Sequence, residues 1–243
     1  MIKNVIVSLV FIVVSVFSLA SAAQDQEERE RPYDASASVG YVGTSGNTDV
    51  TTLNTEFLMT YFDENWTHNF VFNTLSSRQD GDAKAERYFI RNKSDYALMD
   101  EDRYLYAQAS YTDDRFSGFD YQAAVSLGYG QYFLRGDGLD LQGFAGLGYR
   151  QNDSKATGSE GEAVLTLGEE LDWVISETSS LTQALTFEIG DKRTITTFEI
   201  GLESNIVDRI STRIAFQYRN NSDVPPGIKN TDTQTSISLV YTF

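Results

Sequence analysis

The chain has 243 residues, with 35 Asp and Glu against 19 Lys and Arg, and its formal net charge is -16. It has no Cys and one His, which excludes disulfide frameworks, thiolate zinc sites and iron–sulfur centres and leaves any His-dependent chemistry to His68. The acidic balance disfavours a nucleic-acid partner, and a mean hydropathy of -0.32 excludes a bundle of membrane helices, which need about 20 apolar residues each.

The first segment has the build of a secretory signal peptide. Lys3 supplies a positive charge, residues 5–19 are almost wholly apolar, and small residues follow. Residues 1–22 are therefore predicted to be a signal peptide that is cleaved after Ala22 or Ala23, and the loss of Lys3 changes the net charge from -16 to -17. The alternative, an uncleaved membrane anchor, is disfavoured because the apolar stretch is short.

Residues 23–33 are strongly charged and carry no apolar stripe, so they are interpreted as a periplasmic lead-in to the folded part, residues 34–243. From there onward, apolar and polar side chains alternate with a period of two, as they do along a strand whose two faces meet different surroundings. The alternating segments lie near residues 35–41, 52–61, 66–73, 87–98, 105–111, 119–130, 141–150, 162–173, 185–189, 197–203, 213–219 and 234–243.

Turns between these twelve segments fall into two classes. Short polar turns are predicted near residues 63–65, 100–102, 135–138, 176–179 and 208. Mostly longer connections are predicted at residues 77–84, 113–118, 152–161 and 220–230, with short exceptions at 44–47 and 190–193. Short turns on one rim, long loops on the other and both termini on the short-turn rim are typical of an all-β, antiparallel, up-and-down transmembrane β-barrel, here of about 12 strands.

A soluble two-sheet sandwich or a lipocalin-like barrel also alternates and is the competing fold. Its strands would vary in length, whereas these segments run about 10–13 residues, as a tilted strand needs to cross a bilayer. In the membrane barrel the apolar face meets lipid. Aromatic residues near segment ends would then form the interfacial girdles, namely Tyr61, Trp66, Tyr88, Phe133, Trp173 and Phe243.

The polar face of the predicted strands would enclose the lumen. Its charged members are Glu56, Arg87, Arg91, Lys93, Asp120, Asp140, Arg150, Glu162, Glu170, Asp172, Glu188, Glu199, Glu203, Arg213 and Arg219. In one interpretation they pair across strands and fill a narrow interior, because unpaired charges away from water are costly. In the other they line a water-filled passage with a modest preference for cations.

Three stretches resemble a known family. Residues 40–48 read GYVGTSGNT, residues 111–121 read YTDDRFSGFDY, and residues 238–243 read SLVYTF. They are similar to the family called domain of unknown function 481, whose members are often labelled salt-induced outer membrane proteins. The resemblance implies a β-barrel in the outer membrane of a Gram-negative bacterium. It implies no reaction, so no functional residues are transferred from it.

Leu239, Tyr241 and Phe243 share the lipid-facing side of the last segment. By similarity to other outer-membrane proteins, they would form the signal that the barrel-assembly machinery recognises. The plainer interpretation is a last strand that closes the barrel, and both can hold.

The sequence offers few candidate catalytic residues. Some twelve-stranded barrels act as phospholipases with a Ser–His pair, but His68 shares the lipid face with Trp66 and Phe70, and no Ser or Asp lies two residues away on that face. Glu169 and Glu170 are neighbours in a strand, so they point to opposite sides. We therefore expect no enzyme, catalytic residue, cofactor or metal site.

Two classes of function remain. One is a structural or stress-related envelope component, whose loops meet lipopolysaccharide and whose outer face meets lipid. The other is a small-solute or ion channel of the porin type with a mixed-charge, net acidic lumen. In either case a barrel closed by one chain is expected to act as a monomer.

Overall fold

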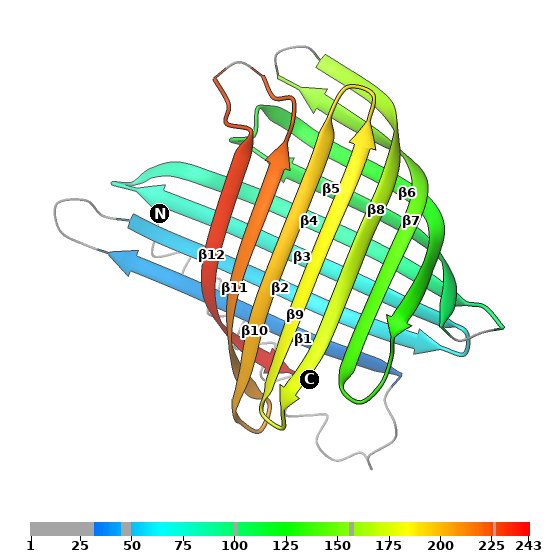
Figure 1. Ribbon diagram of the computed structural model, residues 1–243. Coiled ribbons are helices and arrows are strands. Elements are labelled where there is room, and N and C mark those ends of the chain that lie inside the picture. The colour runs from blue at the N-terminus through cyan, green and yellow to red at the C-terminus, as the bar shows by residue number, and fades with distance from the viewer. Residues whose placement is uncertain (1–31, 45–49, 100–101, 156–157, 226) are drawn as a thin grey trace.

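In the part of the chain that the structure describes, twelve antiparallel strands each pair with their neighbours in sequence, and β1 pairs with β12 to close a barrel (Figure 1). This computed structural model describes residues 32–44, 50–99, 102–155, 158–225 and 227–243. The predicted signal peptide and nearly all of the lead-in lie outside the described residues. The strands are β1 (Tyr33–Thr44), β2 (Val50–Asp63), β3 (Trp66–Gln79), β4 (Asp82–Ala97), β5 (Arg103–Asp114), β6 (Phe119–Leu134), β7 (Leu139–Ser154), β8 (Gly158–Ser176), β9 (Ser179–Gly190), β10 (Thr194–Val207), β11 (Ile210–Asn221) and β12 (Thr231–Thr242).

The prediction of an all-β up-and-down barrel of about twelve strands is confirmed. Among the described residues, no helix has the length and apolar character to span a bilayer. The strands have 12 to 19 residues rather than the predicted 10–13. Because about 9–11 tilted residues suffice to cross a bilayer, the longer strands can continue beyond it.

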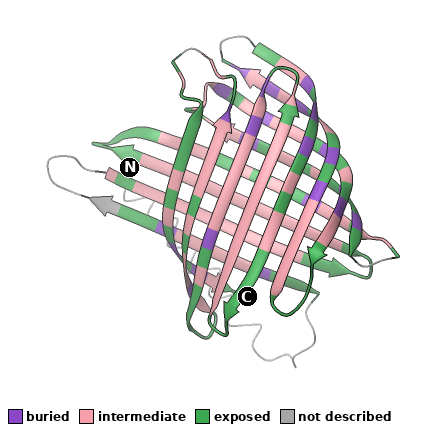
Figure 2. Ribbon diagram, in the orientation of Figure 1, coloured by how far each residue is buried: buried purple, intermediate pink, exposed green. Residues whose placement is uncertain are grey.

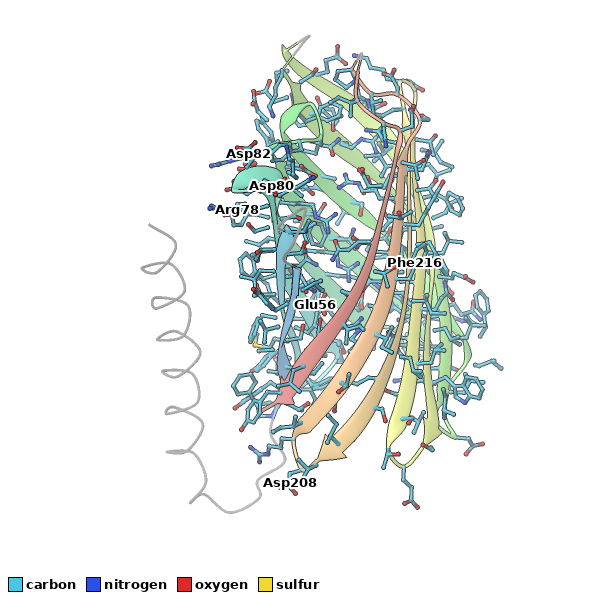
Figure 3. The ribbon with its side chains drawn as sticks, turned by 90° about the vertical axis from the view of Figure 1, so that its left-hand side faces the viewer. Glu56, Arg78, Asp80, Asp82, Asp208 and Phe216 are labelled. Carbon is cyan, nitrogen blue, oxygen red and sulfur yellow. The ribbon has the colours of Figure 1, made fainter. Side chains whose placement is uncertain are left out.

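The short turns lie at one rim, where β1 begins and β12 ends, as predicted. Figure 3 labels Asp208 at this short-turn rim, and Asp80 and Asp82 toward the other end of the molecule. The predicted long connection at residues 77–84 is wrong, because β3 and β4 meet in a two-residue turn of Asp80 and Gly81. Both residues have positive φ, 51° and 88°, the backbone that matches a tight turn to the twist of its strands.

The connection predicted at residues 152–161 is also shorter than expected, because β7 continues to Ser154 and β8 begins at Gly158. Among the described residues, the nine-residue segment between β11 and β12 is the longest connection. The rim opposite the short turns is therefore called the loop rim here, although several of its hairpins are tight.

Burial is inverted relative to a soluble protein, which excludes the competing sandwich. The most deeply buried large side chains are polar, led by Arg150 and Lys93. Leu147, Leu127 and Ile237, on the opposite face of their strands, are 73%, 69% and 60% exposed. Buried residues alternate with exposed ones along β5 and β8, in a barrel wall whose residues are mostly of intermediate exposure (Figure 2). Such an apolar outer face is stable in hydrocarbon, where closure also satisfies the backbone.

A β-bulge in β6 reverses one predicted orientation. The register between β6 and β7 shifts between Phe119 and Tyr121, so Asp120 is an extra residue at the bulge. Phe119, expected on the lipid face, is instead 2% exposed and lines an interior cavity. Asp120, expected in the lumen, is exposed.

The seam between β1 and β12 is short. It has four register pairs, from Ser36 opposite Thr242 to Val39 opposite Leu239. Every other pair of neighbouring strands shares at least ten, the fewest being between β5 and β6. Figure 3 shows β12 leaning away from β1 above this seam. The first and last strands, β1 and β12, therefore pair near the short-turn rim.

Candidate functional site

The lumen near the short-turn rim is filled by an aromatic cluster around one lysine. Tyr104, Tyr106 and Phe144 are 4%, 3% and 7% exposed, and Tyr132 packs against them. The Nζ atom of Lys93, itself 2% exposed, lies 5.3, 5.9 and 4.7 Å from the centres of the Tyr104, Tyr106 and Phe144 rings. These distances are those of cation–π contacts. We call these five residues the aromatic plug.

Polar contacts hold the aromatic plug in place. Lys93 Nζ lies 3.3 Å from Glu170 Oε2 and 3.8 Å from Asp95 Oδ2. The Tyr104 hydroxyl donates to Gln142 Oε1 at 2.6 Å, and Gln142 Nε2 donates to Glu170 Oε2 at 2.9 Å. The buried cation is thus paired, and it is linked to the aromatic rings by a connected network.

Inward-facing glycines make room for the rings. A Cβ added at Gly130 would meet the Tyr104 ring, and one added at Gly168 would meet the Phe144 ring. Glycine is needed at these positions because the ring packs directly on the backbone of the neighbouring strand. The glycines belong to the packing of the aromatic plug.

A second network lies nearer the loop rim. Arg150 is 1% exposed, and its guanidinium binds Glu162 Oε1 at 2.9 Å and Glu188 Oε2 at 3.1 Å. It also donates to the backbone oxygen of Arg193 at 2.9 Å. The Arg193 guanidinium lies 5.1 Å from the ring of Phe119. This network joins β7, β8 and β9 to the turn between β9 and β10.

A third network crosses the lumen. Arg213 on β11 binds Glu56 on β2 at 2.7 Å and Glu199 on β10 at 3.3 Å. Gln217 donates to Glu199 Oε2 at 3.4 Å. Figure 3 labels Glu56 between β2 and β12 and Phe216, the neighbour of Gln217, on the opposite face of β11.

Three further arginines lie between these networks. Arg87, Arg91 and Arg219 line a cavity of about 170 Å³ in the lumen, together with Arg150. Arg87 Nη2 donates to Gln217 Oε1 at 3.0 Å, and Arg219 Nη2 donates to Gln122 Oε1 at 2.8 Å. Within the described residues, none of the three has a carboxylate oxygen within 4 Å. We call Arg87, Arg91 and Arg219 the basic cluster.

The structure brings most of the predicted lumen residues into these groups. They are Glu56, Arg87, Arg91, Lys93, Arg150, Glu162, Glu170, Glu188, Glu199, Arg213 and Arg219. Asp140 and Asp172 lie opposite each other near the short-turn rim, where Asp140 accepts from the Gly136 amide. Glu203 lies opposite Arg213 in the register, and Asp120 is the bulged residue described above.

Sequence reasoning missed the aromatic plug, because aromatic residues were considered only as members of the interfacial girdles, and Tyr104, Tyr106 and Phe144 were assigned to neither face. The alternation of side chains along β5 and β7 does indicate that these rings face inward. Tyr104 and Tyr106 share the parity of Gln108 and Ser110 on β5, opposite Leu105. Phe144 likewise shares the parity of Gln142 and opposes Leu147.

His68 has a serine neighbour that its own strand does not supply. Its Nδ1 lies 2.8 Å from Oγ of Ser94, which sits directly across the ladder on β4. The His68 ring stacks 5.7 Å from that of Trp66, on the outer face. Ser94 Oγ donates to the side-chain oxygen of Asn92. In a catalytic triad the third group would instead bind and orient the histidine ring, and Asn92 contacts the serine.

Glu169 and Glu170 point to opposite faces of β8, as predicted. The Glu170 carboxylate points into the lumen, where it accepts from Gln142 beside the aromatic plug, and Glu169 accepts from Gln183 on an exposed face. In the described part of the chain, no group of three or more His, Cys, Asp or Glu residues could hold a metal ion.

The resemblance found in the sequence is confirmed by comparison. A family model described as "Protein of unknown function, DUF481" matches residues 37–243. The uncharacterized protein YdiY of Escherichia coli (strain K12) is 25% identical over 225 residues, which cover 92% of this chain and 88% of the relative.

Solved structures show a similar fold. The NanC porin has a TM-score of 0.53 and 11% identity, covering 86% of this chain and 99% of its own. An outer membrane channel from Pseudomonas putida F1 has a TM-score of 0.49 and 12% identity, covering 90% and 98%. The translocator domain of the autotransporter NalP from Neisseria meningitidis has a TM-score of 0.48 and 14% identity, covering 99% and 98%. The barrel resembles bacterial outer membrane proteins in fold, and at these identities the likeness extends no further.

Proposed function

The chain belongs to the DUF481 family of proteins of unknown function, and from this premise we propose a non-enzymatic envelope component. It is a structural or stress-related barrel in the outer membrane of a Gram-negative bacterium, and its lumen is blocked toward the short-turn rim. The proposal rests on the outer-membrane-type fold and on what fills the interior.

The aromatic plug is the observation that carries this proposal. Tyr104 follows the first residue of β5, directly after a short turn, and Phe144 lies near the start of β7. Side chains this deeply buried, packed on glycines and joined by hydrogen bonds, leave no room for a wide passage at that end. The cavities of about 170 and 370 Å³ are lined by residues nearer the loop rim.

The outer face supports the location and the partners. Exposed apolar residues such as Leu147 and Ile237 would meet lipid, and the loop rim would meet lipopolysaccharide. One chain closes the barrel without a second copy, and we propose a monomer as the unit in the membrane.

The end of β12 supports the proposed assembly signal. The Phe243 amide donates to Ala35 O at 2.9 Å across the seam, and the Tyr241 and Phe243 rings lie 5.2 Å apart. Leu239, on the same face, is 52% exposed and open to recognition by the barrel-assembly machinery.

A small-solute channel is the second candidate, and the two cavities favour it. They share Arg87, Gln217 and Arg219 as lining residues, so they adjoin one another along the lumen. The arginines on this path would favour anions, in contrast to the cation preference expected from the net acidic lumen. Conduction would also require the aromatic plug to move.

Single-channel recording in planar bilayers tests the proposal. Folded wild-type protein should stay silent, whereas Tyr104→Ala/Phe144→Ala should conduct steadily because both substitutions remove ring volume from the aromatic plug. The double variant also proves that the protein inserts into the bilayer. Steady conductance by the wild type would refute the blocked lumen and support the channel. Silence of both proteins, once protection from added protease shows that both are inserted, would mean that the aromatic plug is not the barrier.

A further inference from the structure

We propose that the basic cluster binds the oxyanion group of a small solute, a carboxylate or a phosphate, that enters from the loop rim. This site goes beyond the proposed function, because a barrel can hold it whether or not it conducts. The argument rests on charge, on hydrogen-bond donors and on the cavity.

The arginines of the basic cluster are not used as ion-pair partners at close range. Arg87 lies directly across the ladder from Asp114, and Arg219 from Asp232. Within the described residues neither pair approaches to 4 Å, although both aspartates are near enough to interact electrostatically with Arg87. The Arg87 guanidinium turns toward the glutamines of β11 and β12, at 3.0 Å from Gln217 and 3.4 Å from Gln234.

Other cations of the lumen behave differently. Lys93, Arg150 and Arg213 each have a carboxylate oxygen within 3.3 Å. The carboxylates of Glu56, Glu162, Glu170, Glu188 and Glu199 are all taken up in those pairs. Among the residues that the structure describes, the basic cluster is therefore left without a carboxylate oxygen within 4 Å, in an interior where unpaired charge is costly.

Hydrogen-bond donors are also left over. The Nε atoms of Arg87, Arg91 and Arg150 are buried without a partner, and all three residues line the inner cavity. The one unpaired buried acceptor among the residues lining this cavity is Asn73 Oδ1, within the described part of the chain. These unpaired guanidinium N–H groups can bind a ligand that offers hydrogen-bond acceptors. Carboxylate and phosphate oxygens are the acceptors that form the strongest hydrogen bonds with guanidinium groups.

The cavities provide the room and the route. The inner cavity, of about 170 Å³, has apolar walls at Val71, Phe89 and Ile195. Glu56, Glu188 and Glu199 also line it, and each is paired with Arg150 or Arg213. The outer cavity, of about 370 Å³, is lined by four basic residues, Lys84, Arg87, Arg219 and Lys229, and by two acidic ones, Asp114 and Asp232, so its lining carries a net positive charge. Arg87 and Arg219 line both, so a small anion would pass the two lysines and meet the basic cluster before the aromatic plug stops it.

The test measures binding directly by titration calorimetry on the folded full-length barrel in detergent, in phosphate-free buffer. The probes are inorganic phosphate and butyrate, which separate the two sources of the oxyanion. The wild type should bind at least one of them saturably. Arg87→Gln/Arg219→Gln should bind it at least about ten-fold more weakly, which corresponds to about 1.4 kcal/mol.

Arg78→Gln is the matched control. Arg78 is an exposed arginine at the end of β3, on the same rim (Figure 3), so the variant removes one positive charge outside the cavities and should bind as the wild type does. A gel comparison of boiled and unboiled samples shows that each variant is folded. If the glutamine variant fails to fold, Arg87→Lys/Arg219→Lys keeps the charge and loses the guanidinium fork, and it should bind measurably more weakly than wild type.

Absence of saturable binding of both probes by the wild type would overturn the proposal and leave the arginines as charges that only balance the acidic lumen at longer range. Equal affinity of the wild type and the folded glutamine variant would place the site elsewhere and also overturn it. Conductance decides the proposed function separately, since a silent barrel can bind the probes and a conducting barrel can fail to bind them.

Discussion

Lys93 supplies the charge at the centre of the aromatic plug, and Lys93→Met removes that charge with little change of volume. Its ammonium is 3.3 Å from Glu170 and 3.8 Å from Asp95, and the lysine side chain is 2% exposed. Removing one partner of a buried ion pair destabilises by about 3–5 kcal/mol, because the other charge stays buried and unpaired. The carboxyl side chains are 21% and 15% exposed, so water offsets part of this cost and we expect about 3 kcal/mol.

The assay is equilibrium unfolding of the barrel in lipid vesicles by urea, followed by tryptophan fluorescence and by gel mobility. Lys192→Met is the matched control, since Lys192 pairs with Glu160 at 3.3 Å but is 50% exposed, and its loss should cost at most about 1 kcal/mol. Lys93→Met/Glu170→Met should recover much of the stability, because an apolar pair replaces the ion pair. If Lys93→Met is no less stable than Lys192→Met, the aromatic plug is not organised around this charge.

Three further predictions follow from the same contacts. Deletion of Phe243 removes a seam hydrogen bond and the terminal ring, so outer-membrane fractions should contain less assembled protein, and normal amounts would contradict the assembly role. Gly130→Ala places a Cβ against the Tyr104 ring and should lower the free energy of unfolding by about 1–3 kcal/mol in the urea assay, whereas an unchanged midpoint would mean that the ring can move aside. Because no described residue orients the His68 ring of the His68–Ser94 pair, wild type and Ser94→Ala should be equally inactive toward an ester substrate, and hydrolysis lost in the variant would reopen the enzyme hypothesis.

The turns illustrate where local sequence is and is not sufficient. Short turns are predicted near residues 63–65 and 208 because polar residues interrupt the alternation there, and the structure has them at residues 64–65 and 208–209. The turn at Asp80 and Gly81 lies within the long connection predicted at residues 77–84, because most of these residues are polar and the alternation is lost there. Strands that project beyond the lipid no longer need an apolar outer face, so alternation stops before the strand does.

The bulge at Asp120 shows a second limit. Parity assigns every residue of a strand to a face only while the pairing is regular, and one inserted residue reverses the assignment beyond it. Phe119 is therefore inside the barrel although its sequence neighbours predicted the outside.

The sequence by itself determined the number of strands, the apolar outer face and most of the charged residues that face inward, because a period of two is a local property of each strand. The tertiary structure decided which inward charges meet. Arg213 pairs with Glu56, 157 positions away in the chain, because closing the barrel brings β11 and β2 to the same side of the lumen. The same closure pairs Lys93 with Glu170 and leaves the basic cluster without a described carboxylate oxygen within 4 Å. No local pattern carries that information, because it depends on how far each strand is displaced along its neighbours.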